Sequence, residues 1–169
     1  IESIKKTGTK INLYKLNKEV LEKQIYGTTL FSNVMNICFI DLETTGLNKE
    51  EDKIIEIALK TVKIDKAEGN IMLFDDKYES FQDPGIEIEE KISLITGITD
   101  SMVTGHEINW EKVNEIVNNT DIMIAHNARF DRAFLDRNMS LSKDKVWACS
   151  VSDIDWLHRG FAKSSLELL

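Results

Sequence analysis

Three acidic residues in two well-separated segments could act together in this chain of 169 residues. Asp41 and Glu43 close one apolar segment, and Asp131 follows another. Residues two apart on a strand point to the same face, so the Asp41 and Glu43 carboxylates would lie roughly 5 to 7 Å apart and repel each other without a cation between them. Carboxylate oxygens suit Mg²⁺ or Mn²⁺. If Asp131 lies near the same strand end, the three acids predict a cation site.

Each of these acids also has a simpler structural interpretation. A bare Asp-x-Glu pair can merely end a strand in solvent, as Asp41 and Glu43 would. Asp131 falls near the start of a predicted helix, where the helix dipole favours a negative charge. Asn127 can be the N-cap of that helix. Single residues therefore do not separate the two interpretations.

Hydrophobic periodicity indicates the elements that must position these acids. The apolar segment 36–43 predicts a buried central strand. Segments 53–64 and 71–82 predict two further strands, and the hairpin signal Gly69-Asn70 makes them antiparallel. The later elements are predicted as helices over 88–95, 109–117 and 127–139, strands over 121–125 and 146–149, and a last helix over 151–157. This order predicts an α/β fold with a mixed β-sheet flanked by helices.

Residues 1–35 differ from the rest of the chain. Their periodicity is weak, and Leu16, Val20 and Leu21 are placed to form one or two helical turns. We interpret residues 1–35 as an N-terminal extension with a short helix, which packs as an arm or joins another domain. Residues 36–169 form the predicted main domain.

The composition of the chain limits its partners and its compartment. Asp and Glu outnumber Lys and Arg by 29 to 21, so net charge gives no support for nucleic-acid binding. Clustered carboxylates can instead bind cations that then bind phosphate. No apolar run reaches the roughly 18 to 20 residues of a membrane span. Cys38 and Cys149 lie in apolar segments and predict buried, reduced thiols, which fits a cytoplasmic protein.

Three blocks of sequence occur in an order that is specific as a set. They are Phe39-Ile40-Asp41-Leu42-Glu43-Thr44-Thr45-Gly46-Leu47, then Glu56 within Ile54-Ile55-Glu56-Ile57-Ala58, then Ile124 to Leu135 with His126-Asn127-Ala128-Arg129-Phe130-Asp131. Together they resemble the conserved motifs of the DEDD superfamily of exonucleases. Over about residues 36–150 the chain looks like the proofreading epsilon subunits of bacterial DNA polymerase III, or a stand-alone relative of them.

The resemblance implies a ribonuclease H-like fold and hydrolysis of a terminal phosphodiester with two Mg²⁺ or Mn²⁺ ions. By carry-over, Asp41 would bridge both ions, Glu43 would bind one of them, and Asp131 would hold the second. The implied substrate-binding residues are Thr45, Gly46, Leu47, Asn127 and Phe130. For Leu47 and Phe130, packing in the core is the alternative.

The chain departs from the superfamily in its late motif. The histidine subclass (DEDDh) places a catalytic His five residues before a last metal-binding Asp, late in the domain. His106 and His158 have no Asp five residues later, and His126 belongs with Asp131 to the second block rather than to a late motif. The wording His126-Asn127-Ala128 still assigns the chain to this subclass. We therefore expect the domain over 36–169 to stop before its final motif, with the general base unknown and absent from these residues.

The resulting prediction is a metal-dependent 3′→5′ exonuclease that releases nucleoside monophosphates from DNA in proofreading or repair. Its expected partners are single-stranded or frayed 3′ ends and a polymerase subunit, and no membrane. Two alternatives stay open: an exoribonuclease or small-oligonucleotide nuclease, and a catalytically silent scaffold module.

Overall fold

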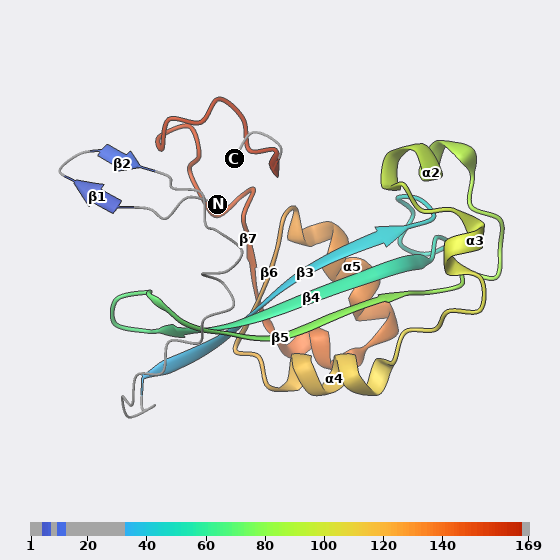
Figure 1. The fold of residues 1–169 in the computed structure, drawn as a ribbon, viewed down its shortest axis with the longest axis horizontal. Helices are drawn as coiled ribbons and strands as arrows, with labels where there is room; N and C mark the ends of the chain where they lie inside the picture. Colours follow the sequence, from blue (N-terminus) through green and yellow to red (C-terminus); the bar gives the residue numbers. More distant parts are fainter. Residues whose placement is uncertain (1–4, 8–9, 13–32, 167–169) are drawn as a thin grey trace.

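The main sheet of the protein carries five strands in the order β5-β4-β3-β6-β7. The computed structural model describes residues 5–7, 10–12 and 33–166. Strands β3 (Val34–Thr44), β4 (Ile54–Asp65) and β5 (Ile71–Phe81) are antiparallel neighbours. Strands β6 (Ile122–Ala125) and β7 (Val146–Cys149) continue the sheet parallel to β3 (Figure 1). The predicted mixed sheet and its antiparallel hairpin are therefore confirmed.

Along the chain, the helices follow β5 and alternate with the last two strands, as the sequence predicted. Helices α2 (Glu90–Thr96) and α3 (Asp100–Val103) follow β5, and α4 (Trp110–Asn118) leads into β6. Helix α5 (Ala128–Asn138) connects β6 to β7 through the 3₁₀ helix η1 (Ser140–Asp144). Because β6 and β7 are parallel, α5 is the crossover that a parallel pair needs. No helix among the described residues is long and apolar enough to cross a membrane.

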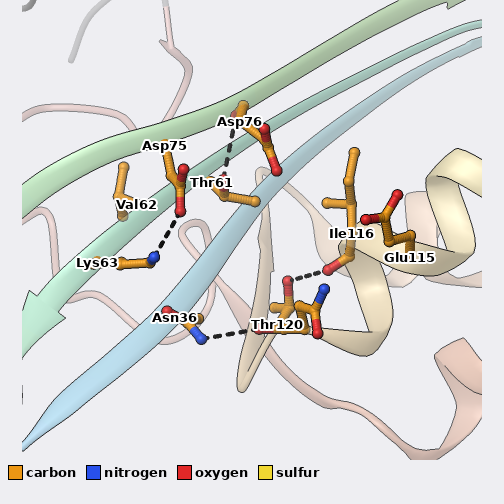
Figure 2. Close-up of a pocket in the computed structure, with 10 residues that line it drawn as sticks. Asn36, Thr61, Val62, Lys63, Asp75, Asp76, Glu115, Ile116 and Thr120 are labelled. Carbon is orange, nitrogen blue, oxygen red and sulfur yellow. Dashed lines mark hydrogen bonds and ion pairs between the residues drawn. The ribbon is translucent and has the colours of Figure 1, made fainter. Parts of the chain in front are cut away.

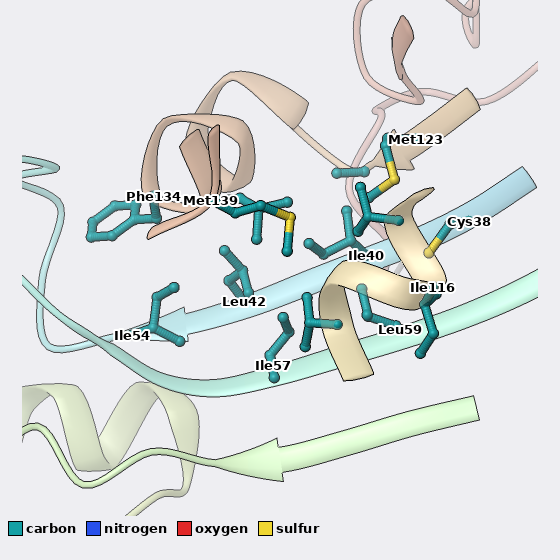
Figure 3. Packing of buried hydrophobic residues seen from close by; sticks show 14 of the residues in the cluster. Cys38, Ile40, Leu42, Ile54, Ile57, Leu59, Ile116, Met123, Phe134 and Met139 are labelled. Carbon is teal, nitrogen blue, oxygen red and sulfur yellow. The ribbon is translucent and has the colours of Figure 1, made fainter. Parts of the chain in front are cut away.

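Alternation along β3 separates a core face from an accessible face. Cys38, Ile40 and Leu42 are buried, while Phe39 between them is 44% exposed. The buried side chains meet β4 and the inward faces of α4 and α5, where Phe134 is fully buried (Figure 3). This period of two is what places Asp41 on the accessible face.

A register shift in β4 divides the core into two clusters. Glu43 pairs with Glu56 and Thr44 pairs with Ile54, so Ile55 is the extra residue of a bulge. Ile54 stays in the main cluster, whereas Ile55 joins a second cluster beneath α2 and α3. The bulge therefore seats α2 and α3 beside the end of β3 that carries the acids (Figure 1).

One predicted helix needs correction. The predicted helix over 151–157 is wrong, because this segment forms turns. Asp153 accepts from the Cys149 amide and Asp155 accepts from the His158 amide. Such side-chain to backbone bonds offer the chain an alternative to the helix.

Some elements were not predicted, and the prediction for the cysteines was only partly right. Helix α3, the 3₁₀ helix and the pair β1 (Lys5–Thr7) and β2 (Lys10–Asn12) were not predicted. Both cysteines are free, and Cys38 is buried as predicted, but Cys149 is only partly buried. The short helix predicted within residues 1–35 lies outside the described residues.

Candidate metal and substrate site

Two of the three predicted acids lie on the accessible face of the central strand. Asp41 and Glu43 stand two apart near the end of β3, so both carboxylates project from the same face of the sheet. Directly across the antiparallel pair, Glu43 faces Glu56 of β4. Like charges directly opposite each other on a sheet are destabilising. The strand end therefore concentrates negative charge.

Asp131 reaches this strand end from helix α5. Strand β6 pairs with β3 only as far as Phe39, so the edge of β3 beyond that point has lost its strand partner. The Asp131 carboxylate takes this place, because its Oδ1 accepts the Leu42 backbone N–H at 3.0 Å. Asp131 is 3% exposed. The structure thus brings an acid 88 positions beyond Glu43 to the strand that carries Asp41 and Glu43.

The electrostatics of the three acids show that they act on one another. Burial and then the nearby Asp41 raise the pKa of Asp131 to about 7, with the Leu42 amide opposing the shift. Burial and then Asp41 and Glu56 raise the pKa of Glu43. Partial burial also raises the pKa of Asp41, against the opposing effect of His126. A cation would relieve this mutual repulsion.

The donor set fits Mg²⁺ or Mn²⁺ in its chemistry, because these cations prefer carboxylate oxygens. The side chains do not form a finished cage. Within the described part of the chain, no three acidic, histidine or cysteine side chains converge closely enough to hold a metal ion. Asp41 and Glu43 lie at the end of β3, and Asp131 meets that strand from α5.

The loop after β3 is organised by one carboxylate, that of Asp52. Its Oδ1 accepts the Thr45 hydroxyl at 3.0 Å and its Oδ2 accepts the Asn48 amide at 2.8 Å. Gly46 packs so closely that a Cβ there would lie 2.7 Å from the Asp52 Cγ. The Thr45 amide donates to the Lys53 carbonyl at 2.8 Å. The backbone amide of Thr45, a predicted substrate-binding residue, is therefore already engaged in the structure.

Arg137 joins this loop to the helix that carries Asp131. The Arg137 guanidinium donates to the backbone carbonyls of Lys49 and Asp52. It also lies 5.6 Å from the centre of the Phe134 ring, in the core beneath α5. The loop and the acid-bearing helix are thereby held as one unit. Neither Asp52 nor Arg137 was singled out in the sequence, because nothing local relates residues 85 positions apart.

The predicted substrate-binding residues come from two elements, the loop after β3 and the start of α5. Leu47 projects into solvent with 85% of its surface exposed, which excludes the core-packing alternative for it. Phe130 is half-buried and packs on Phe134, with ring centres 5.0 Å apart. Asn127 occupies the N-cap position of α5 in the left-handed conformation, at φ 68°, with no side-chain capping bond. Among described residues other than glycine, only Asn127 has a positive φ, and such local strain is common at functional sites.

The three histidines occupy different environments. His126 shares a hydrogen bond of 2.9 Å between its Nδ1 and the Ser150 hydroxyl, and it lies near enough to Asp41 to affect that carboxyl group. His106 packs edge-on against Phe81, and His158 is exposed in the turns after β7. His126 is thus the one that borders the acids. Ser150, its partner, was not identified from the sequence, since only the end of β7 brings it there.

A hollow lies at the end of the sheet opposite the acids (Figure 2). It has a volume of about 240 Å³ and is bordered by Asn36, Thr61, Lys63 and Asp75. Asn36 precedes Glu43 by seven positions on β3, which places this hollow roughly 20 Å from the acids. It is therefore separate from the candidate metal site.

Comparison with known proteins gives a consistent result. The sequence model of the RNase_T family, described as exonuclease, matches residues 38–165. A PolC-type DNA polymerase III from Clostridium perfringens is 39% identical over 102 residues, which cover 59% of this chain and 6% of the polymerase. The PolC-type enzyme of Thermotoga petrophila is 34% identical over 140 residues, covering 80% and 9%. The chain therefore spans less than a tenth of these relatives.

Solved structures agree on the fold. Exonuclease X in complex with 5′ overhanging duplex DNA has a TM-score of 0.55 and 27% identity, over 79% of this chain and 70% of that one. Unliganded exonuclease I has a TM-score of 0.58 over 80% of this chain and 36% of its own, and at 19% identity it supports the fold alone. These similarities confirm the predicted ribonuclease H-like arrangement.

Proposed function

This chain belongs to the exonuclease family, and on that premise we propose that it is a metal-dependent 3′→5′ exonuclease acting on DNA. It would hydrolyse the terminal phosphodiester bond and release nucleoside monophosphates. The observation that carries the proposal is the gathering of Asp41, Glu43 and Asp131 at one strand end, where their charges repel one another.

The acids of this strand end would hold two Mg²⁺ or Mn²⁺ ions. Asp41 is the proposed shared ligand, with Glu43 on one ion and Asp131 on the other. Asp131 keeps its Oδ1 on the Leu42 amide, so its second oxygen is the one directed to a cation. Bound cations supply an activated water and stabilise the leaving oxygen.

The residues around the acids would position the end of the strand. Exposed Leu47 offers an apolar contact to the terminal base, and Phe130 offers a second, since base contacts with apolar side chains tolerate any sequence. The Gly46 amide and the Asn127 side chain are the proposed polar contacts. Asp52 and Arg137 hold the loop that presents Gly46 and Leu47.

The proposed substrates are single-stranded or frayed 3′ ends of DNA, and a polymerase is the proposed partner. The identity to PolC-type polymerases supports both. A cytoplasmic location is proposed with them, supported by two cysteines that are both free. An exoribonuclease is the competing function, because the described site contains no evident contact that discriminates the sugar.

The test is digestion of 5′-labelled single-stranded DNA and RNA by the protein with Mn²⁺, beside Asp41→Asn and Asp76→Asn. Asp41→Asn should reduce the rate at least about a hundredfold, since residues that merely orient metal ligands typically account for 10- to 100-fold. Asp76→Asn changes the same charge at the far hollow and should leave the rate unchanged. DNA should be degraded faster than RNA.

The outcomes separate the alternatives. Faster digestion of RNA would make the protein an exoribonuclease. Equal rates for wild type and Asp41→Asn would reject the nuclease function and leave the scaffold module.

A further inference from the structure

A basic groove lies between helix α5 and strand β7, at one edge of the sheet. It has a volume of about 440 Å³, and its positive charges come from Lys49, Arg129 and Arg132. Arg129 and Arg132 are three apart on α5 and so lie on one face of the helix. In a chain with net charge −8, three cations around one hollow mark a place where a polyanion can bind.

The two carboxylates that also line the groove are occupied by donors from the protein. Asp136 accepts the Ser142 hydroxyl on one oxygen and pairs with Arg132 at 3.4 Å on the other. Asp153 accepts the Cys149 amide and the Ser152 hydroxyl, each at 2.8 Å. Asp136 and Arg132 offset each other's charge, and Asp153 keeps its negative charge, so the positive charge of the groove comes from Lys49 and Arg129.

The cations differ in how firmly they are held. Arg132 is fixed in the groove wall, since it also donates to the Lys143 carbonyl at 3.3 Å and lies 6.0 Å from the centre of the Trp147 ring. Arg129 is exposed in the first turn of α5. Lys49 is exposed as well, and its nearest carboxylate is that of Glu50 at 3.8 Å. Arg129 and Lys49 are thus available to a ligand.

Residues of the groove adjoin residues of the candidate site at two points along the chain. Ala128 lines it and directly follows Asn127, while Lys49 lies two positions after Leu47 on the loop that Arg137 holds. Asp131 contacts the Leu42 amide while the next residue, Arg132, lines the groove. Consecutive helix residues point about 100° apart around the axis, so a strand that leaves the acids would reach the groove within a few nucleotides.

We infer that this groove binds the sugar-phosphate backbone of the substrate strand, a few nucleotides from the 3′ end that the acids hold. The inference rests on the proposed nuclease function and adds to it a path for the strand. Contacts to phosphate carry no sequence information, so the groove would add affinity for longer strands of any sequence.

The test is binding of a fluorescent single strand of roughly 20 nucleotides in EDTA, where cations cannot support hydrolysis, at several salt concentrations. The double variant Lys49→Gln/Arg129→Gln removes the two available cations. The matched control, Lys77→Gln/Lys112→Gln, removes two cations from exposed positions on β5 and α4. Thermal melting of both variants checks that each is folded.

The groove variant should bind the long strand at least about tenfold more weakly, and its log–log salt slope should fall by roughly 1.4 for two lost phosphate contacts. The control should match wild type. With Mn²⁺, the groove variant should degrade long strands more slowly than wild type but trinucleotides at the wild-type rate.

Equal affinity and equal salt slope in the two double variants would overturn the inference, as would failure of the wild type to bind the long strand. A loss of binding together with no Asp41-dependent hydrolysis would sustain the groove and reject the nuclease function. The two proposals can therefore fail separately.

Discussion

Both ends of the central sheet carry clustered acidic residues, but the two ends treat those charges differently. At the far end, Asp75 pairs with Lys63 at 2.9 Å, and Asp121 accepts the Asn36 amide at 2.8 Å. At the site end, Asp41 and Glu43 raise the pKa of Asp131 further than its burial alone would. Acids at the two ends of one sheet are thus paired at one end and left in mutual repulsion at the other.

This difference supports the proposal that the acids at the site end bind a cation. Burying a carboxylate without a counter-charge destabilises the fold, so a protein retains such an arrangement where something outside the fold compensates it. A divalent cation is a compensation of that kind at Asp131. The acids described at the far end need no cation, because they already have partners within the protein.

The largest expected effect is a difference in hydrolysis rate between Asp→Asn substitutions at the two ends of the sheet. Asp131→Asn should lower Mn²⁺-dependent hydrolysis at least about a hundredfold, because it removes a proposed ligand, while the amide oxygen can still accept the Leu42 N–H. Asp75→Asn should stay within twofold of wild type. Initial rates on labelled DNA measure both, and similar losses at the two ends would show that the two acidic clusters do not differ in function.

Stability against pH should differ between the wild type and Asp131→Asn in the absence of metal. The folded pKa of Asp131 is raised to about 7 from an ordinary value of 3.8, so the folded state holds the proton more tightly and its stability falls as pH rises between these values. Asp131→Asn lacks this loss and should be the more stable protein at pH 8, by up to a few kcal/mol. Urea unfolding at pH 5 and pH 8 in EDTA measures it; a wild type that gains stability relative to the variant would contradict the assignment.

Cation binding should stabilise the site end selectively. A ligand at a hundred times its Kd adds about 2.7 kcal/mol to the free energy of unfolding, so Mn²⁺ should raise the melting temperature of the wild type and of Asp75→Asn. Asp131→Asn should show a much smaller rise. This readout is independent of catalysis, and an equal rise in all three proteins would place the cation elsewhere.

The smallest effect is expected where the charges are already paired. Lys63 and Asp75 are each about one-third exposed, and exposed ion pairs contribute up to about 1 kcal/mol. Lys63→Gln should therefore lower the free energy of unfolding by no more than that, with hydrolysis unchanged. Urea unfolding of this variant measures the change, and a loss of several kcal/mol would show that the far end is structurally more important than its exposure suggests.

The sequence by itself determined the strands, the main helices and the identity of the three acids. Periods of two and of about 3.6 residues are local properties, so they indicated β3, β4 and α5 to within a few residues. The same reasoning failed over 151–157, because Asp153 and Asp155 use their side chains to bond the backbone in turns.

Only the tertiary structure decided how these elements meet. The early end of the β3–β6 pairing opens an edge for Asp131. Arg137 holds the loop that presents Leu47. These relations join residues far apart in the chain, and they depend on burial, register and like-charge repulsion, which no local pattern records. The sequence identified the acids, and the tertiary structure brings their charges together, where a bound cation would reduce the repulsion between them.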